Sequence, residues 1–194
     1  MDRRGFLNLI LIGTAGLLMG HSPYRQWYVY RRRRLFILTS AAEEPSFPLG
    51  QTLAQVLATY LPESQAMAAR ARDSVEIVKL LGSRQLDVAL LQVDDANDAS
   101  QGKGKFQEEG PVPLRVLAIF GSYLLVCRDD FSRQKAYQIA KTLAEHQSEL
   151  KPVGYQEASS GLREKDPLAL PLHPGALDFY EGRPLPLELE EEKP

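Results

Sequence analysis

Residues 73–95 read DSVEIVKLLGSRQLDVALLQVDD, and this stretch decides the fold class. Asp73 and Ser74 offer a cap for a helix over the VEIVKLLGSRQ segment, and Glu76, three residues past Asp73, completes a capping box. Residues 88–93 (VALLQV) are almost wholly apolar, as in a strand buried on both faces, and Asp94-Asp95 follow at once. A helix that leads into such a strand predicts a parallel α/β sheet.

The alternation of strands and helices continues on both sides of this stretch. Four segments have strand character, namely residues 35–39 (LFILT), 65–72, 114–120 (LRVLAIF) and 123–128 (YLLVCR). Two further segments have helical spacing of apolar residues, one that starts at Pro48 and closes at Pro62, and one over residues 134–150. We therefore predict βαβ units in a single three-layer α/β lobe over residues 35–182.

Composition excludes several classes of protein. A chain with 44% hydrophobic and 25% charged residues is an ordinary folded chain. Its one cysteine, Cys127, cannot form an internal disulfide, and three scattered histidines (His21, His146 and His173) give no metal-ligand pattern. The glycines and lysines of residues 100–110 lack the spacing of a phosphate-binding loop. We expect no cofactor, no metal and no enzymatic activity.

Charge is divided unevenly along the chain. Residues 1–34 hold seven arginines and one aspartate, a net charge of +6, so the remainder must carry −8 to reach the total of −2. An acidic body argues against nucleic-acid binding. Residues 183–194 are expected to form an acidic, proline-containing tail.

The first 34 residues have the pattern of a targeting segment. Arg3-Arg4 precede residues 5–20, an uncharged apolar run of about 16 residues, close to the roughly 20 that span a bilayer. The run resembles a twin-arginine export signal, and no A-x-A cleavage site follows it. Because tyrosines and a tryptophan come next, we favour an uncleaved anchor over residues 5–30, with a removed signal peptide as the alternative. Arg31–Arg34 argue against an anchor that leaves the rest of the chain outside the cytoplasm, because positive charge beside an apolar run favours the cytoplasmic side.

Four segments together resemble the TAXI family of solute-binding subunits of TRAP transporters. They are PSFPLG at 45–50, DSVEIVKLL at 73–81 with DVALLQVD at 87–94, LRVLAIFGSYLLVCRDD at 114–130, and PLHPGA at 171–176 followed by Phe179 and Tyr180. The resemblance implies a periplasmic-binding-protein-like lobe. It places six residues at positions that line the family's cleft: Ser40, Ser46, Phe47, Ser74, Gln92 and Asp94.

The resemblance also implies that half of a two-lobed protein is missing. Members of the family cross into a second lobe after the segment equivalent to residues 123–128, whereas here residues 129–133 run directly into the returning helix. A single lobe offers half of the ligand contacts of a closing cleft. Glu43-Glu44-Pro45 stand where the family has glycines, so two carboxylates would repel an acidic solute there.

Simpler interpretations exist for the polar residues that stand out. Asp94-Asp95 could hold a cation or act as acid and base, but aspartates at strand ends also cap helices. Ser74 could meet an anion or serve as part of a cap. Cys127 is expected to be an inert core residue, His173 to fix a turn and begin the last helix, and His146 to be solvated.

Two functions remain open from the sequence. The first is a non-enzymatic accessory or docking subunit of an integral membrane protein complex, anchored on the periplasmic side of the bacterial inner membrane. The alternative is the solute-binding component of a TRAP transporter, with a glutamate-like carboxylate as ligand and a dimer mate or the permease as the missing half.

Overall fold

The structure is a computed structural model that describes residues 34–150, 155–156 and 170–185. The predicted anchor, its basic junction and the predicted tail after residue 185 lie outside the described residues. Within the described ranges, no helix has the length and apolar character needed to cross a membrane.

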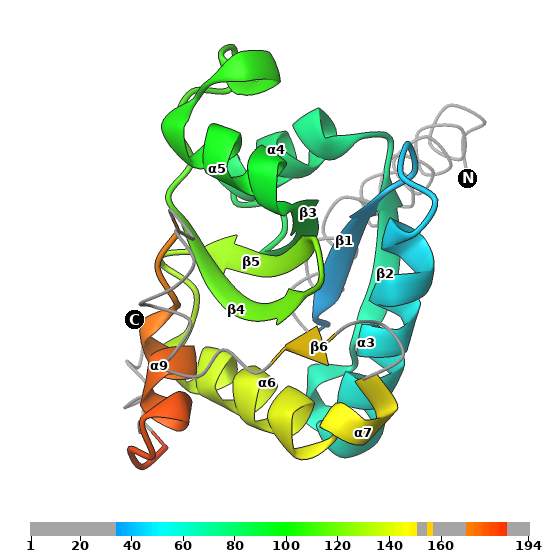
Figure 1. The fold of residues 1–194 in the computed structure, drawn as a ribbon, viewed down its shortest axis with the longest axis vertical. Coiled ribbons are helices and arrows are strands. Elements are labelled where there is room, and N and C mark those ends of the chain that lie inside the picture. Colours follow the sequence, from blue (N-terminus) through cyan, green and yellow to red (C-terminus); the bar gives the residue numbers. More distant parts are fainter. Residues whose placement is uncertain (1–33, 151–154, 157–169, 186–194) are drawn as a thin grey trace, which may run out of the picture. The chain divides into compact units, whose positions relative to one another are not determined.

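A mixed sheet forms the centre of the lobe (Figure 1). Its strands are β1 (Phe36–Ser40), β2 (Met67–Ala71), β3 (Val88–Gln92), β4 (Leu114–Phe120), β5 (Tyr123–Arg128) and β6 (Tyr155–Gln156), in the order β2-β1-β3-β5-β4-β6. β1 pairs in parallel with β2 and β3, as the βαβ pattern predicts. β5 is antiparallel to both of its neighbours, β3 and β4, so the hairpin at Gly121-Ser122 inserts β5 between two strands that run the same way.

Helices cover both faces of this sheet. The helical elements are α3 (Ser46–Tyr60), η1 (Pro62–Ser64), α4 (Ser74–Gly82), α5 (Val93–Gln101), η2 (Gly104–Phe106), α6 (Arg133–Glu145), α7 (Gln147–Leu150) and α9 (Pro174–Tyr180). Figure 1 shows α4 and α5 on one side of the strands and α6 and α7 on the other. The predicted three-layer α/β lobe is therefore confirmed.

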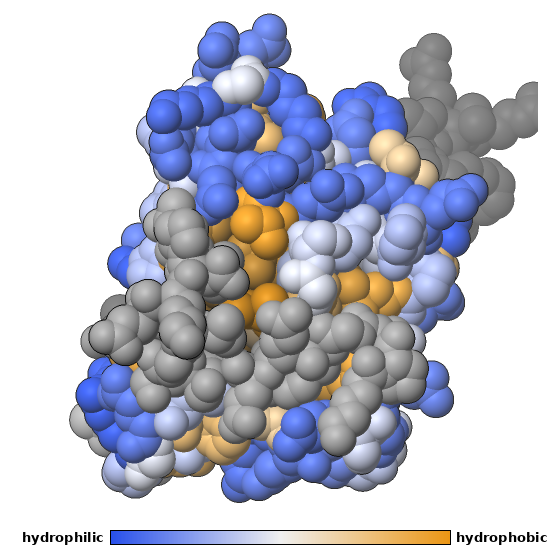
Figure 2. Space-filling view, in the orientation of Figure 1, coloured by the Kyte–Doolittle hydropathy of each residue, from blue (hydrophilic) through white to orange (hydrophobic). Residues whose placement is uncertain are grey.

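Two buried clusters fill the spaces between the layers. In one, Leu53 of α3 and Ile139 of α6 pack with Ile37 of β1. In the other, Ile77 of α4 packs with Leu38, the next residue of β1. Because successive strand residues point to opposite faces, a strand covered on both sides must be apolar throughout, which explains the unbroken run in β3. In Figure 2, hydrophobic residues show in the middle of the visible face, at the level of the sheet.

The predicted cap of α4 by Asp73 is confirmed, but the reciprocal bond of the capping box goes to the residue before the N-cap. The Asp73 carboxylate accepts a hydrogen bond from the Glu76 amide at 2.8 Å, and the Glu76 carboxylate accepts one from the Arg72 amide at 2.6 Å. The strand predicted within residues 65–72 is β2. α3 begins at Ser46, two residues before the predicted start at Pro48, because proline fits the first helical turn.

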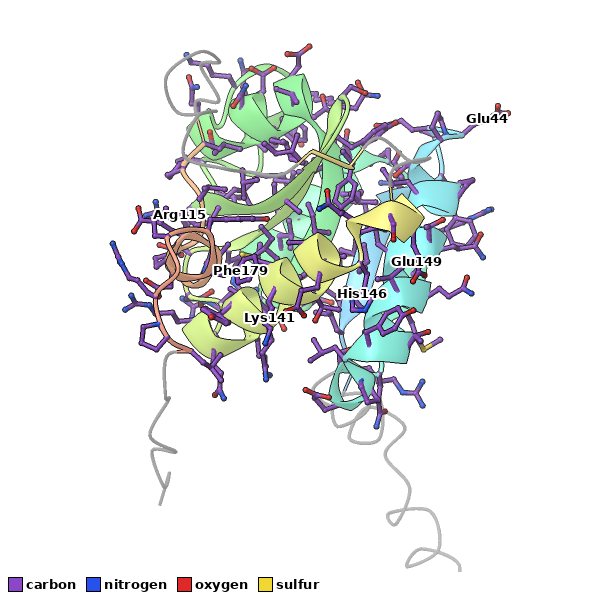
Figure 3. All side chains as sticks on the ribbon, turned by 60° about the horizontal axis from the view of Figure 1, so that its bottom comes forward. Glu44, Arg115, Lys141, His146, Glu149 and Phe179 are labelled. Atoms are coloured by element: carbon purple, nitrogen blue, oxygen red, sulfur yellow. The ribbon has the colours of Figure 1, made fainter. Side chains whose placement is uncertain are left out.

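The single helix predicted over residues 134–150 is wrong, since α6 ends at Glu145 and α7 begins at Gln147. His146 interrupts it with φ −109° and ψ 27°. The prediction of a solvated His146 is also wrong: its ring stacks on Tyr60 with 3.5 Å between centroids, and Nδ1 lies 3.0 Å from the Thr142 carbonyl oxygen. Figure 3 shows His146 and Glu149 beside α3, where the Tyr60 hydroxyl donates to Glu149 at 2.7 Å.

Candidate functional site

Three strand-to-helix connections meet at one edge of the sheet. β1, β2 and β3 are parallel, and each leads at its carboxyl end into a helix, namely α3, α4 or α5. Ligands of open α/β sheets bind outside the carboxyl ends of the strands. We refer to this region as the carboxyl edge.

All six residues predicted to line a cleft lie at the carboxyl edge. Ser40 ends β1 and Gln92 ends β3, while Ser46 and Phe47 begin α3, Ser74 begins α4, and Asp94 lies in the first turn of α5. The structure thus brings them to one edge from three loops that are distant in sequence. Their role in binding a ligand stays a prediction.

Ser40 and Ser46 form the buried part of the carboxyl edge. Both are almost fully inaccessible, and the Ser46 hydroxyl oxygen accepts a hydrogen bond from the Ser40 amide at 3.1 Å. The Ser40 hydroxyl itself is buried and has no hydrogen-bond partner within the described part of the chain. Burying an unpaired hydroxyl costs free energy, and such a group in a native fold requires an explanation. A ligand atom that pairs with the Ser40 hydroxyl would supply one.

Helix N-termini supply amide donors at the same edge. No side chain caps α3, whose N-cap is Pro45, or α5, whose N-cap is Gln92. α4 is capped by Asp73, so the cap at this position is Asp73 and Ser74 is the buried first residue of the helix. Uncapped N-termini favour anions through their free amides and the helix dipole.

Sequence reasoning missed Tyr123, although it placed Glu43 in the loop that faces a solute. Tyr123 begins β5 and pairs with Gln92 across the sheet. Burial raises the pKa of the Tyr123 phenol, and a hydrogen bond to the Glu43 carboxylate raises it further, whereas one with Gln92 lowers it. Pairing of β5 with β3 creates this cluster, and no local pattern predicts that pairing.

Charged side chains give the carboxyl edge both signs. The Arg70 guanidinium lies 3.7 Å from the centroid of the Phe47 ring, a cation–π contact that keeps a positive charge beside α3. Asp95 forms an ion pair with Lys105 at 2.8 Å, whereas its neighbour Asp94 is exposed. Figure 3 shows Glu44 projecting away from the fold.

Among the described residues, no group of three His, Cys, Asp or Glu side chains could hold a metal ion.

His173 does what we predicted, because it begins the last helix. As the N-cap of α9, its Nδ1 accepts the Gly175 amide at 3.1 Å, while Nε2 lies 2.9 Å from the Phe131 carbonyl and therefore donates to it. Position 175 accommodates only glycine, because the Cβ of any other residue would overlap the carbonyl oxygen of Arg133. The prediction for Cys127 is confirmed too: it is fully buried, and burial raises the pKa of its thiol.

The connection after β5 is as short as the sequence suggested. β5 ends at Arg128 and α6 begins at Arg133, so only residues 129–132 join them. α6 then packs with α9 against the sheet. No lobe is inserted between β5 and α6.

Comparison with known protein families agrees with this lobe. Residues 37–123 match the NMT1-like family. The NMT1-like region runs from the second residue of β1 to the first residue of β5, and it includes all six predicted cleft residues and Tyr123. The family is periplasmic-binding-protein-like, which supports a protein of the solute-binding type. The finer resemblance to the TAXI family stays a prediction. No curated protein matches the chain.

Proposed function

We propose that this chain is a non-enzymatic protein of the solute-binding type, with the carboxyl edge as one wall of its solute site. The observation that carries the proposal is the buried Ser40 hydroxyl, which lacks a partner within the described residues at the edge where α/β sheets bind ligands. The match of residues 37–123 to the NMT1-like family supports the same assignment.

The proposed solute is a small carboxylate, such as a glutamate-like acid. Two uncapped helix N-termini and Arg70 favour a negative group at the carboxyl edge. Glu43, Glu44 and Asp94 oppose it, so a carboxylate must lie against the Phe47 amide of α3 rather than at the acidic rim, since the Ser46 and Leu49 amides donate to carbonyls and Pro48 has no N–H. Affinity for the lobe alone should be weak, because one wall covers about half of a ligand.

The second wall would come from a membrane partner. In this proposal the chain is a TAXI-like subunit that residues 5–30 anchor on the periplasmic side of the bacterial inner membrane, next to a TRAP permease. The tight turn at Gly121-Ser122 supports the need for a partner, since β4 and β5 meet there at the carboxyl edge and, within the described residues, no lobe is inserted between them to close over that edge.

Calorimetry on the detergent-solubilised full chain tests the solute site. L-glutamate, succinate and 2-oxoglutarate are titrated into the wild type, Ser40→Ala and Ser148→Ala, where Ser148 is an exposed serine of α7. Removing an unpaired buried hydroxyl should leave stability unchanged or raised, while binding weakens about tenfold, which corresponds to about 1.4 kcal/mol. If Ser40→Ala binds as the wild type does, or no acid binds, the proposed site is wrong.

A docking role is the second candidate. The observation that favours it is the tight turn at Gly121-Ser122, which joins β4 to β5 at the carboxyl edge and leaves that edge open to a protein surface. Purification from solubilised membranes without added solute should then recover a stoichiometric integral membrane partner. Recovery of a free monomer under mild conditions would count against docking and leave the solute-binding proposal to calorimetry.

A further inference from the structure

A second pocket lies at the opposite edge of the sheet from the proposed solute site. It has a volume of about 360 Å³, which equals roughly twelve water molecules at about 30 Å³ each. Its walls are the C-terminal half of α4, the segment that enters β4, and the end of β5. These segments meet at the amino ends of the parallel strands, so the pocket is separate from the carboxyl edge.

The charged side chains of this pocket are arranged by sign. Lys79 and Arg84 stand on the α4 wall, whereas Glu109 and Asp129 stand on the walls that lead into β4 and out of β5. Lys79, Glu109 and Asp129 form no ion pair within the described part of the chain. Pro111 and Pro113, both exposed, contribute apolar surface to the same pocket.

Arg128 fixes the base of the pocket and is not available to a ligand. Its guanidinium donates to Asp130 at 2.7 Å and to the Leu86 carbonyl at 3.0 Å, and it pairs with Asp87 at 3.2 Å. Only 11% of its side chain is exposed. With its charge balanced by these acids, the groups left to meet a ligand are Lys79 and Arg84 on one wall and Glu109 and Asp129 on the others.

Arg84 carries the second positive charge of the α4 wall. It follows the C-cap of α4 with φ +58°, a left-handed conformation that glycine adopts at no cost and arginine does not. Gln65 is the other non-glycine residue with positive φ in the described part of the chain. Both residues stand at the end of a helical element, where the left-handed conformation is common. The Arg84 guanidinium lies 3.5 Å from the Asp130 carboxylate, which also lines the pocket.

We propose that this pocket binds a small zwitterion, an amino acid whose ammonium and carboxylate groups are joined by a short aliphatic chain. The carboxylate pairs with Lys79 and Arg84, and the ammonium with Glu109 and Asp129. The aliphatic chain lies on Pro111 and Pro113. A ligand with one charge would leave one wall unpaired, so both charges are needed for affinity.

NMR titration of the isotopically labelled full chain in detergent tests this inference. The probes are 4-aminobutyrate and its single-charge analogues butyrate and butylammonium. We expect 4-aminobutyrate to shift the amides of residues 82–84 and 129–130 in a saturable way, with at least tenfold weaker binding of both analogues. Equal binding of the three probes, or no shift at these amides, would overturn the proposal.

Matched variants separate a binding role from a structural one. Lys79→Met keeps the aliphatic stem and Glu109→Gln keeps the shape, so each should weaken 4-aminobutyrate about tenfold while the spectrum stays folded. Lys141→Met and Glu44→Gln, exposed residues outside the pocket, should bind as the wild type does. Arg84→Gly should leave the chain as stable or more stable and still weaken binding. Shifts confined to residues 40–47 and 92–95 would overturn this pocket while supporting the carboxyl edge.

Discussion

His173 can satisfy both of its ring nitrogens only as the neutral imidazole with its proton on Nε2. Nδ1 accepts the Gly175 amide and Nε2 donates to the Phe131 carbonyl. Burial lowers the pKa of His173, the Phe131 hydrogen bond raises it, and the positive charges of Arg115 and Arg133 lower it again, against a raising effect of Asp129. The net effect is a lowered pKa for His173. Over a range of pH below the ordinary pKa, His173 is therefore neutral in the folded lobe and protonated in the unfolded chain.

Stability should therefore fall as the pH drops through the range of His173. Above about pH 6.5 the histidine is neutral in both states and its contribution is complete. Below that value the unfolded chain is protonated first, and the free energy of unfolding declines until the pH passes the lowered pKa. We expect His173→Asn, which keeps a cap but cannot titrate, to be about 1 kcal/mol less stable at pH 8 and to show a flatter decline toward pH 5. Urea unfolding at several pH values measures this, and parallel curves for the two proteins would contradict it.

At the scale of elements, one buried carboxylate joins α6 to α9. Asp178 of α9 receives two hydrogen bonds from Arg133 of α6, at 2.5 and 2.9 Å, and one from Arg183 at 3.0 Å. Its side chain is only 3% exposed, although both arginines are about half exposed. These hydrogen bonds with Arg133 lower the pKa of Asp178.

Neutralising this carboxylate should loosen α9. Asp178→Asn keeps the shape but loses charge-assisted hydrogen bonds, so we expect a loss of about 2 kcal/mol in the free energy of unfolding at pH 7. Glu181→Gln, which removes a more exposed partner of Arg183, serves as the control and should cost less than about 0.5 kcal/mol. Amide exchange in α9 and denaturant unfolding measure both variants. An Asp178→Asn protein as stable as the control would show that packing alone holds α9.

Helices and strands were predictable from the sequence where their pattern lies in neighbouring residues. The helix cap at Asp73 and the apolar run of β3 both follow from neighbouring residues, and both are as predicted. The break of the last long helix at His146 has no signal in the local pattern, and His146 stacks there on Tyr60, a contact distant in sequence. The cleft positions followed from a family resemblance, whereas Tyr123 joins Glu43 only through the insertion of β5 beside β3.

At the scale of the whole molecule, the order of strands decides which surfaces exist. Two strands separated by Gly121-Ser122 are evident from sequence, but the pairing of β5 with β3 depends on contacts that are distant in sequence. This pairing places Tyr123 at the carboxyl edge and Arg128 at the opposite edge. The two proposed sites therefore lie at opposite ends of one antiparallel strand. Each can be tested by variants that leave the other untouched.

The C-terminal helices complete the core even though they lie beyond the NMT1-like region. Ile139 and Leu143 of α6 and Leu150 of α7 belong to the same buried cluster as Leu117 and Leu125 of the sheet. Losing one such side chain costs about 2–5 kcal/mol, and a typical domain has only about 5–15 kcal/mol in total. The region that matches the family should thus be unable to fold by itself.

A chain ended after Asp130 should then lack cooperative unfolding. It keeps β1 to β5 but exposes the face of the sheet that α6, α7 and α9 cover, so we expect a near-ultraviolet circular dichroism signal close to zero and no sharp thermal transition. A chain ended after Leu185 is the control, because no described core residue is removed, and it should unfold at the temperature of the full chain. A cooperative transition in the shorter chain would mean that the α6 layer only covers a lobe that is already stable. In that case the returning helices would be free to serve a partner instead of the core.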